Sequence, residues 1–315
     1  MKKVEKDLLI IGAGPAGLGA ALYAKRAGVD FKIVEKYMAG GQITNTEFIE
    51  NYLGFKEKIS GFDLVKNFVE HCKKLGIKIE EYTNIESVEP VDKNNGKIFK
   101  CKVFDKEDLY EVKSIIIATG ASPKMLHVKG EKELIGSGIS FCATCDGALY
   151  KDKEVAVVGG GDTAIEEALF LAKFAKKVYI IHRRDELRAV NILQERAFGN
   201  NKIKILWGSV IEEFIGKERL QKIKVRNKKE DKSYTMNIDG VFEYVGYKPN
   251  AGLAKDLVDS DNNGFIITDR YMRTSFKGIY AAGDVRSTAL RQVITAVSDG
   301  AVAATSLDKQ LRGLL

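Results

Sequence analysis

One unit occurs twice in this sequence, in the order apolar run, glycine-rich turn, helical stretch and second apolar run. The first copy runs from Asp7 to Glu35 and the second from Glu154 to His182, and each position of the second lies 147 residues after its counterpart. Both turns fit the pattern G-x-G-x-x-[G/A] between a strand and a helix, which is typical of dinucleotide sites. The duplication therefore predicts an α/β chain with two Rossmann-like dinucleotide-binding domains, one inserted in the other.

Each part of the repeated unit has a predicted place in the fold. The expected strands are 7–11, 31–34, 154–158 and 178–181; the first helix should end at Ala27, before Gly28, and the second should continue through Ala175. The glycines permit a tight turn and close approach of the backbone to a pyrophosphate, and the helix N-terminus offers free N–H groups. The predicted turn contacts are Gly12, Gly14, Pro15, Ala16 and Gly17 in the first copy, and Gly159, Gly161, Asp162, Thr163 and Ala164 in the second.

The two copies differ at the end of their second strand, where the adenosine is recognised. The first copy has Glu35, followed by Lys36, and an acid there accepts hydrogen bonds from ribose hydroxyls. The second copy has a basic group instead, made of His182, Arg183, Arg184 and Arg188. Arginine binds a 2′-phosphate well, so the second site is expected to prefer NADPH to NADH. The alternative is a basic strand end that is merely solvated.

Other segments are expected to return to the first nucleotide, which is interpreted as FAD. An apolar strand, 114–117, runs into a small-residue turn, and a similar strand near the C-terminus ends in an acid that suits a ribityl hydroxyl. A glycine-aspartate pair is also ordinary turn chemistry. A helix beginning near residue 291 would direct its N-terminus at the flavin or pyrophosphate. The further candidate contacts are Gly41, Gln42, Asn51, Ala118, Thr119, Gly120, Gly283, Asp284, Arg291, Gln292 and Val293.

This assignment gives a discontinuous first domain. Residues 1–119 and 248–315 form the expected FAD-binding domain, and residues 120–247 form the inserted NADPH-binding domain. The chain should cross between them near 120–123 and 245–249. Pro123 and Pro249 fall in these crossings, and proline is typical of positions where helices and strands stop.

A Cys-x-x-Cys motif, Cys142 to Cys145, precedes the second unit. Such a pair can close a disulfide and often has lowered thiol pKa values, which favours redox chemistry. Half of a zinc site is the alternative, but the sequence offers no second ligand pair; a purely structural disulfide is disfavoured in a reducing cytosol. Asp146 follows directly and is a candidate general acid and base. The isolated Cys72 and Cys101 are expected to be buried and inert.

Composition excludes several classes of protein. Apolar residues make up 45% of the chain and charged residues 30%, which is typical of a globular protein. No apolar run is long enough for a membrane span, and the N-terminus lacks signal-peptide features, so a cytoplasmic location without membrane association is expected. The net charge of +7 comes from Lys and Arg spread along the chain, so no nucleic-acid partner is expected.

Taken together, the motifs resemble those of the low-molecular-weight, bacterial-type thioredoxin reductases over essentially the whole chain. The matching segments are residues 12–17, 40–42, 50–52, 118–120, 142–146, 159–162, 182–188 and 282–284. The resemblance implies a homodimer, thioredoxin as substrate and a rotation of the inserted domain. It also implies that Cys145 lies beside the flavin, that Cys142 attacks thioredoxin and that Asp146 donates the proton.

The partner is the least constrained part of this interpretation. Residues 148–150 read Ala-Leu-Tyr where the family often carries aromatic residues that help to dock thioredoxin. A related flavin reductase that uses another redoxin or ferredoxin is one alternative, although the ferredoxin-fed relatives lack the basic cluster. A flavin-binding redox sensor is the other.

Overall fold

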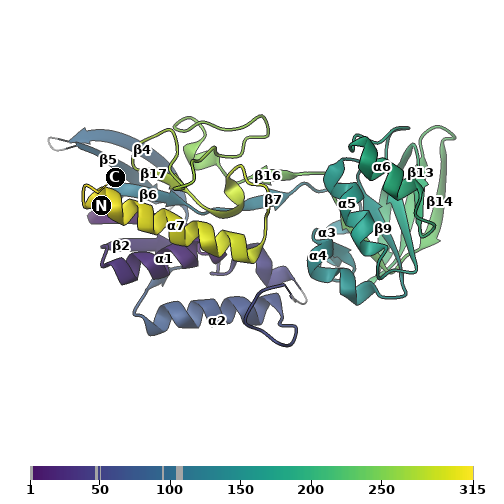
Figure 1. The fold of residues 1–315 in the computed structure, drawn as a ribbon, viewed down its shortest axis with the longest axis horizontal. Coiled ribbons are helices and arrows are strands. Elements are labelled where there is room, and N and C mark those ends of the chain that lie inside the picture. Colours follow the sequence, from purple (N-terminus) through teal and green to yellow (C-terminus); the bar gives the residue numbers. More distant parts are fainter. Residues whose placement is uncertain (1–2, 47–48, 50, 94–95, 104–108, 315) are drawn as a thin grey trace. The chain divides into compact units, whose positions relative to one another are not determined.

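The computed structural model describes residues 3–46, 49, 51–93, 96–103 and 109–314. The chain divides into two compact units (Figure 1). The first consists of residues 1–44, 61–122 and 248–315, and the second of residues 45–60 and 123–247. The segment 45–60 thus groups with the second unit, whereas the sequence analysis assigned it to the first domain.

The first unit is built on a seven-stranded sheet in the order β3-β2-β1-β6-β5-β4, with β17 also paired to β6. The pairs β1–β2, β1–β6, β2–β3 and β6–β17 are parallel, whereas β4–β5 and β5–β6 are antiparallel. The strands are β1 (Lys3–Ile11), β2 (Phe31–Val34), β3 (Ile79–Glu80), β4 (Ile85–Lys93), β5 (Gly96–Val103), β6 (Leu109–Ile117) and β17 (Ile279–Ala281). The helices are α1 (Pro15–Ala27), α2 (Gly61–Lys74) and α7 (Val293–Leu311), with short 3-10 turns at Gly41–Asn45, Gly252–Ala254 and Gly283–Val285.

The apolar run of β1 is continuous because the strand is buried on both faces. Leu8 and Ile10 belong to one core cluster, and Leu9 and Ile11 to another on the opposite face. Side chains alternate along a strand, so a strand covered on both sides needs apolar residues at every position. α1 and α7 lie side by side on one of these faces (Figure 1).

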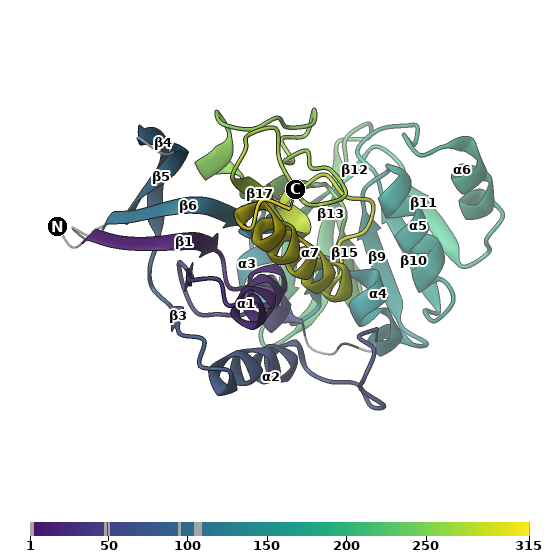
Figure 2. The same ribbon diagram turned by 60° about the vertical axis from the view of Figure 1, so that its left-hand side comes forward.

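The second unit has a five-stranded sheet in the order β11-β10-β9-β15-β8, whose pairs are parallel, and an antiparallel three-stranded sheet β12-β13-β14. The strands are β8 (Ile139–Ser140), β9 (Glu154–Val158), β10 (Lys177–Ile181), β11 (Ile203–Leu206), β12 (Ser209–Gly216), β13 (Leu220–Asn227), β14 (Lys232–Asn237) and β15 (Gly240–Glu243). The helices are α3 (Glu131–Leu134), α4 (Ala143–Asp146), α5 (Asp162–Leu171) and α6 (Asn191–Phe198), with a 3-10 turn at Gly147–Tyr150. α5 packs on β9 and β10 (Figure 2).

The repeated unit folds as predicted in both copies, except at the end of the helix in the second copy. α1 ends at Ala27 and Gly28 follows with φ +75°, whereas α5 ends at Leu171 and not at Ala175. Residues 172–174 form a turn, in which the N–H of Phe174 bonds to the carbonyl of Leu171 at 3.0 Å. The turn is needed because Lys176 must bond to the carbonyl of Lys153, at 2.8 Å, before β10 can pair with β9.

The two crossings between the units are short strands, β7 (Ala121–Pro123) and β16 (Tyr247–Pro249), and they pair with each other as a two-stranded ribbon. Within the first unit, the N–H of Asn250 donates to the carbonyl of Gly120 at 2.9 Å. Within the second, the N–H of Lys124 donates to the carbonyl of Gly246, also at 2.9 Å. Each unit therefore closes its own two chain ends with a hydrogen bond.

Candidate active site

The first glycine-rich turn, at the N-terminus of α1, has no space for larger side chains. Gly12 has φ +103°, and a β-carbon on it would lie 2.4 Å from the carbonyl oxygen of Ala118. A β-carbon on Gly17 would lie 1.8 Å from the oxygen of Gly12. No side chain caps the N-terminus of α1 and its first turn contains no acid, so its N–H groups remain available to an anionic ligand. The carboxylate of Glu35 lies at this turn and accepts the N–H of Ala13 at 2.7 Å.

Segments far apart in the sequence converge on this turn. A β-carbon on Gly41 would lie 3.3 Å from Cα of Gly14, and one on Gly283 would lie 2.8 Å from Cβ of Ala16. Together with the contact of Ala118 on Gly12, these distances bring three of the predicted segments to one place. Lys36 is exposed beside Glu35. Asn51 lies in the segment 45–60 of the second unit, and its contact with a flavin stays a prediction.

Asp284 follows β17 at this site and is largely desolvated. Burial raises the pKa of Asp284 to about 6, with a further increase from Asp299, while Arg291 acts in the opposite direction. Asp299 itself forms a partly buried ion pair with Arg286, whose Nε lies 2.6 Å from Oδ2, and it also accepts the N–H of Gly283 at 3.1 Å. Because a desolvated carboxyl group is costly unless it is hydrogen-bonded, a hydroxyl group of a ligand at this position would stabilise it.

The side chains at the start of α7 have structural partners of their own. Gln292 is the N-cap and forms a capping box with Thr295, so the helix begins at Val293 as expected. The guanidinium of Arg291 lies over the ring of Phe265, 4.2 Å from its centroid. These contacts fix the N-terminus of α7 without using its backbone N–H groups beyond the cap.

Two polar residues predicted to contact the flavin, Gln42 and Thr119, also anchor the start of the ribbon, and their contact with a flavin stays a prediction. The side-chain amide of Gln42 donates to the carbonyl of Ala121. The hydroxyl of Thr119 donates to the carbonyl of Asn250 at 2.7 Å, and the amide of Asn250 donates back to the carbonyl of Thr119 at 2.9 Å. The turn 118–120 is thereby fixed against the returning chain.

The second glycine-rich turn, at the N-terminus of α5, has a similar form. Gly161 is the N-cap without a side-chain cap, and a β-carbon on Gly159 would lie 2.7 Å from Cβ of Ala164. Asp162 and Thr163 are exposed in the first turn of the helix. Oδ1 of Asp162 accepts the N–H of Val190 at 2.7 Å, which ties the turn to the segment that carries the basic residues.

The basic group divides into one buried and three exposed residues. The ring of His182 is buried over Gly160, and its Nε2 lies 2.9 Å from the carbonyl oxygen of Glu186. Burial lowers the pKa of His182, and the cations of Arg188 and Arg184 lower it further. Arg183, Arg184 and Arg188 are exposed, and within the described ranges no ion pair engages their guanidinium groups. Three free cations beside a glycine-rich turn can receive a phosphate.

Cys142 and Cys145 form a disulfide across the short helix α4, with their Cα atoms 5.3 Å apart. Cys142 is the N-cap of α4, so the bond spans one helical turn. The disulfide belongs to the second unit and directly precedes its nucleotide-binding fold.

Ser140 links this turn to the candidate acid. Its hydroxyl accepts the N–H of Cys142 at 3.1 Å and donates to Oδ2 of Asp146 at 2.5 Å. A hydroxyl that donates to a carboxylate over this distance makes a charge-assisted hydrogen bond. Asp146 is therefore held at the end of the turn that carries both sulfurs. No local signal in the sequence identified Ser140.

Three further residues that the sequence analysis missed support the same turn. The hydroxyl of Tyr244 accepts the N–H of Ala143 at 2.6 Å, and the hydroxyl of Tyr247 donates to the carbonyl of Phe141 at 2.8 Å. Tyr244 in turn donates to Glu167 on α5, and burial is the main cause that raises the pKa of Glu167, to about 7. The two hydrogen bonds from the tyrosine hydroxyls to the turn join residues 101 and 106 positions apart, so no local sequence pattern predicts them.

The other two cysteines are free and buried, as predicted. Burial raises the pKa of Cys72 to about 11 and that of Cys101 to about 12, so both stay protonated thiols near neutral pH. Within the part of the chain that the structure describes, no three metal-ligating side chains come together, and no helix is both long and apolar enough to cross a membrane.

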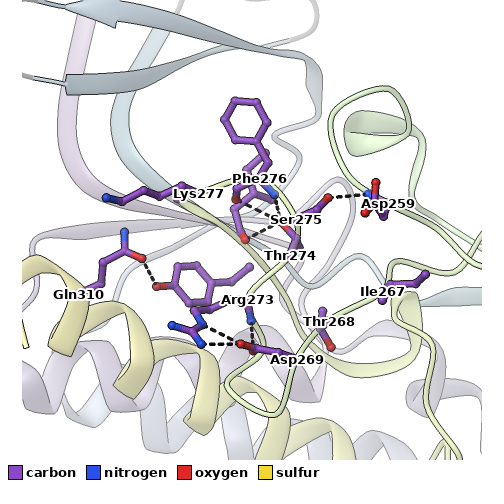
Figure 3. A pocket seen from close by; sticks show the side chains of 13 residues that line it. Asp259, Ile267, Thr268, Asp269, Arg273, Thr274, Ser275, Phe276, Lys277 and Gln310 are labelled. Carbon is purple, nitrogen blue, oxygen red and sulfur yellow. Dashed lines mark hydrogen bonds and ion pairs between the residues drawn. The ribbon is translucent and has the colours of Figure 1, made fainter. Parts of the chain in front are cut away.

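A cavity of about 590 Å³ lies elsewhere in the first unit (Figure 3). Its polar side chains bind one another: Arg273 pairs with Asp269 at 2.7 Å, and the hydroxyl of Tyr280 donates to Gln310 at 2.9 Å. It contains neither glycine-rich turn nor the disulfide. We therefore locate the chemistry at the turns and the disulfide and not in this cavity.

Comparison with known proteins gives a consistent picture. Residues 6–300 match the Pyridine nucleotide-disulphide oxidoreductase family. The chain is 44% identical over 308 residues to a 34.2 kDa protein in the rubredoxin operon of Clostridium pasteurianum, covering 98% of this chain and 97% of the relative. It is 44% identical over 309 residues to the thioredoxin reductase of Listeria innocua, covering 98% and 94%. The crystal structure of thioredoxin reductase from Streptococcus pyogenes is similar with a TM-score of 0.89 at 43% identity, over 98% of this chain and 99% of that one.

Proposed function

Because the chain belongs to the pyridine nucleotide-disulphide oxidoreductase family, we propose that it carries electrons from NADPH through FAD to oxidised thioredoxin. It is an oxidoreductase of the flavoprotein disulfide reductase type, with two Rossmann-like units and a redox-active disulfide. The observation that carries the proposal is the Cys142–Cys145 disulfide with a carboxyl group held beside it, in the same unit as the second nucleotide turn.

The first unit suits FAD. The turn at Gly12 and Gly17 has no room for a side chain, and the N-terminus of α1 is uncapped, which fits a pyrophosphate. Glu35 at the end of β2 would bind the ribose of an adenosine without a 2′-phosphate, and Asp284 would bind a ribityl hydroxyl. When bound, the flavin supplies the means to accept two electrons from a nicotinamide and pass them to a disulfide.

The second unit suits NADPH. The uncapped N-terminus of α5 would bind the pyrophosphate, and the exposed Arg183, Arg184 and Arg188 would bind the 2′-phosphate. The buried His182 would act indirectly, because its ring packs on Gly160 and fixes the turn next to the arginines.

The protein's own residues perform the disulfide exchange. Two electrons break the Cys142–Cys145 bond and leave both sulfurs reduced. We assign Cys145 as the sulfur that receives the electrons and Cys142 as the thiolate that attacks the partner disulfide. Asp146, held by Ser140, would deliver and later recover the proton that accompanies this exchange.

The remaining parts of the proposal concern the assembly and the setting. We infer a homodimer that works in the cytoplasm on a protein disulfide, without nucleic-acid or membrane partners. Another redoxin in place of thioredoxin is the second candidate. The exposed arginine cluster favours NADPH over ferredoxin as the electron source.

One experiment tests the function. The purified protein should be yellow and release FAD, not FMN, on denaturation. With NADPH it should reduce the disulfide of thioredoxin in a panel of oxidised redoxins, measured as NADPH consumption together with new thiols on the partner. A colourless protein that cannot be reconstituted with FAD would refute the assignment.

A further inference from the structure

A partly buried hydrogen-bonded chain connects the disulfide turn to helix α5. Ala143 is the first residue of α4, between the two cysteines, and its N–H donates to the hydroxyl of Tyr244 at 2.6 Å. Because that hydroxyl accepts a hydrogen bond from Ala143, its O–H points away from Ala143. The O–H donates a hydrogen bond to the carboxyl group of Glu167. α4 and α5 pack against each other, which brings Glu167 beneath the redox turn.

Tyr244 is fixed at both ends. Its backbone N–H donates to the carbonyl of Val158 at 2.8 Å, and a β-carbon on Gly159 would lie 2.7 Å from its carbonyl oxygen. Its backbone thus abuts the second glycine-rich turn while its hydroxyl holds the disulfide turn. Oε2 of Glu167 is buried and has no hydrogen-bond partner within the described residues. The hydrogen bond from Tyr244 therefore offsets only part of the desolvation cost of an ionised Glu167 carboxylate.

The groups that face this chain are acidic or neutral. Glu166 comes from α5 itself, Asp146 from α4 and Tyr247 from β16. Burial raises the pKa of Glu167 to about 7; Glu166 adds to the increase, and the hydrogen bond from Tyr244 opposes it. Burial also raises the pKa of Tyr244, and the nearby carboxylates of Glu167 and Asp146 contribute. No cation is present among these groups to stabilise an added negative charge.

We propose that Glu167, acting through Tyr244, couples proton uptake to reduction of the disulfide. Reduction breaks the S–S bond and adds two electrons; one sulfur takes a proton and becomes a thiol, and the other remains a thiolate. The thiolate adds a negative charge to a group that already contains the carboxyl groups of Glu167, Glu166 and Asp146. Glu167 takes a second proton from solvent and becomes a carboxylic acid, so the total charge of the group does not change. Glu167 is a positioning residue that touches neither sulfur.

This inference rests on the proposed function only for the source of the two electrons. The test supplies them from dithiothreitol, which is oxidised to its cyclic disulfide, so neither NADPH nor thioredoxin is needed. The full-length, FAD-loaded protein is equilibrated with mixtures of reduced and oxidised dithiothreitol at pH 6 and at pH 8.5. Alkylation and mass spectrometry then measure the fraction of Cys142 and Cys145 that is reduced. Failure of the enzyme assay would leave this measurement readable.

Glu167→Gln should make the disulfide easier to reduce at pH 8.5 and have little effect at pH 6. At pH 8.5 the wild-type carboxyl is ionised before reduction. Removing its charge should therefore raise the equilibrium constant for reduction of the disulfide by dithiothreitol about three- to tenfold, which corresponds to a reduction potential higher by about 15–30 mV. At pH 6 the wild-type carboxyl is already neutral. A merely structural role would shift the equilibrium equally at both pH values.

Tyr244→Phe keeps the partly buried ring but removes both the donor to Glu167 and the acceptor of the Ala143 N–H. Without that hydrogen bond the carboxyl should stay neutral to higher pH, so the difference between wild type and variant should again be larger at pH 8.5 than at pH 6. Adding Glu167→Gln to Tyr244→Phe should then produce little further pH-dependent change. Glu195→Gln, which removes an exposed carboxylate on α6, is the matched control and should match wild type. Equal shifts at both pH values, or none in either variant, would overturn the proposal.

Discussion

The hydroxyl of Ser140 donates to Oδ2 of Asp146 at 2.5 Å, and the Oγ of Ser140 accepts the backbone N–H of Cys142 at 3.1 Å. One buried serine thereby joins the start of the redox turn to the carboxyl group at its end. The geometry of Asp146 relative to both sulfurs depends on this contact, because α4 is only four residues long and has no side-chain cap of its own.

Ser140→Ala should slow thioredoxin reduction without slowing reduction of the flavin by NADPH. Loss of a charge-assisted hydrogen bond costs about 1.5–3 kcal/mol, which corresponds to a roughly 10- to 150-fold lower rate if the contact persists through proton transfer. Stopped-flow absorbance separates the two half-reactions. Ser140→Thr retains the hydroxyl and should recover most of the rate, and Asp146→Asn should be at least as slow as Ser140→Ala. Equal loss in both half-reactions would contradict a role confined to Asp146.

The two cysteines should not be interchangeable. Cys145→Ser should keep a partner-reactive thiol on Cys142 and accumulate a stable mixed disulfide with thioredoxin, because no resolving thiol remains. Cys142→Ser should abolish transfer to thioredoxin, although NADPH should still reduce the flavin. Mass spectrometry of the trapped adducts identifies the attacking sulfur. A partner bound to Cys145 in the Cys142→Ser protein would reverse the assignment.

Replacing the exposed arginines should change the choice of nucleotide. Arg183→Gln and Arg184→Gln should each raise KM for NADPH about 10- to 150-fold and leave KM for NADH nearly unchanged, because a charge-assisted phosphate contact contributes about 1.5–3 kcal/mol. Steady-state kinetics with both nucleotides measures this. Arg196→Gln, an exposed arginine on α6, serves as control. Equal efficiency of the wild type with both nucleotides would refute the role of the cluster.

Glu243→Gln should stabilise the protein at alkaline pH. Glu243 is 2% exposed and lies against the buried Glu131, whose carboxylate accepts the N–H groups of Leu126 and His127 at 2.6 Å each. Burial raises the pKa of Glu243 from 4.5 to about 9, and Glu131 adds to the increase. Below pH 4.5 the carboxyl is protonated in both the folded and unfolded states. Between pH 4.5 and 9 only the unfolded state ionises, so stability falls as pH rises.

The variant has no such loss, because its side-chain amide does not ionise in either the folded or the unfolded state. Its advantage in the free energy of unfolding should therefore be near zero at pH 4.5 and reach about 2–4 kcal/mol at pH 8. Denaturant unfolding at the two pH values measures the difference. An advantage that does not grow with pH would exclude a protonated Glu243 in the folded protein.

The strands and helices around the two glycine-rich turns could be predicted because their signals are local. The apolar run of β1, whose side chains point alternately into two buried faces, lies within a few residues of the first glycine of the turn. The predicted end of α5 was wrong because an alanine-rich segment favours a longer helix. The pairing of β10 with β9 requires a turn there instead. The supports of the active site were missed for a different reason. Tyr244 meets Ala143 across 101 positions of sequence, and only the folded chain brings them together.

The pairing of β7 with β16 has a consequence for how such a chain can arise. The ribbon brings both ends of residues 123–247 to adjacent positions, and the hydrogen bond between Lys124 and Gly246 closes that segment on itself. A segment whose ends already meet can enter a host fold at one loop without stretching it. Two copies of one ancestral nucleotide-binding unit could therefore become nested rather than merely joined in tandem, and the host sheet could still recruit β17 after the interruption.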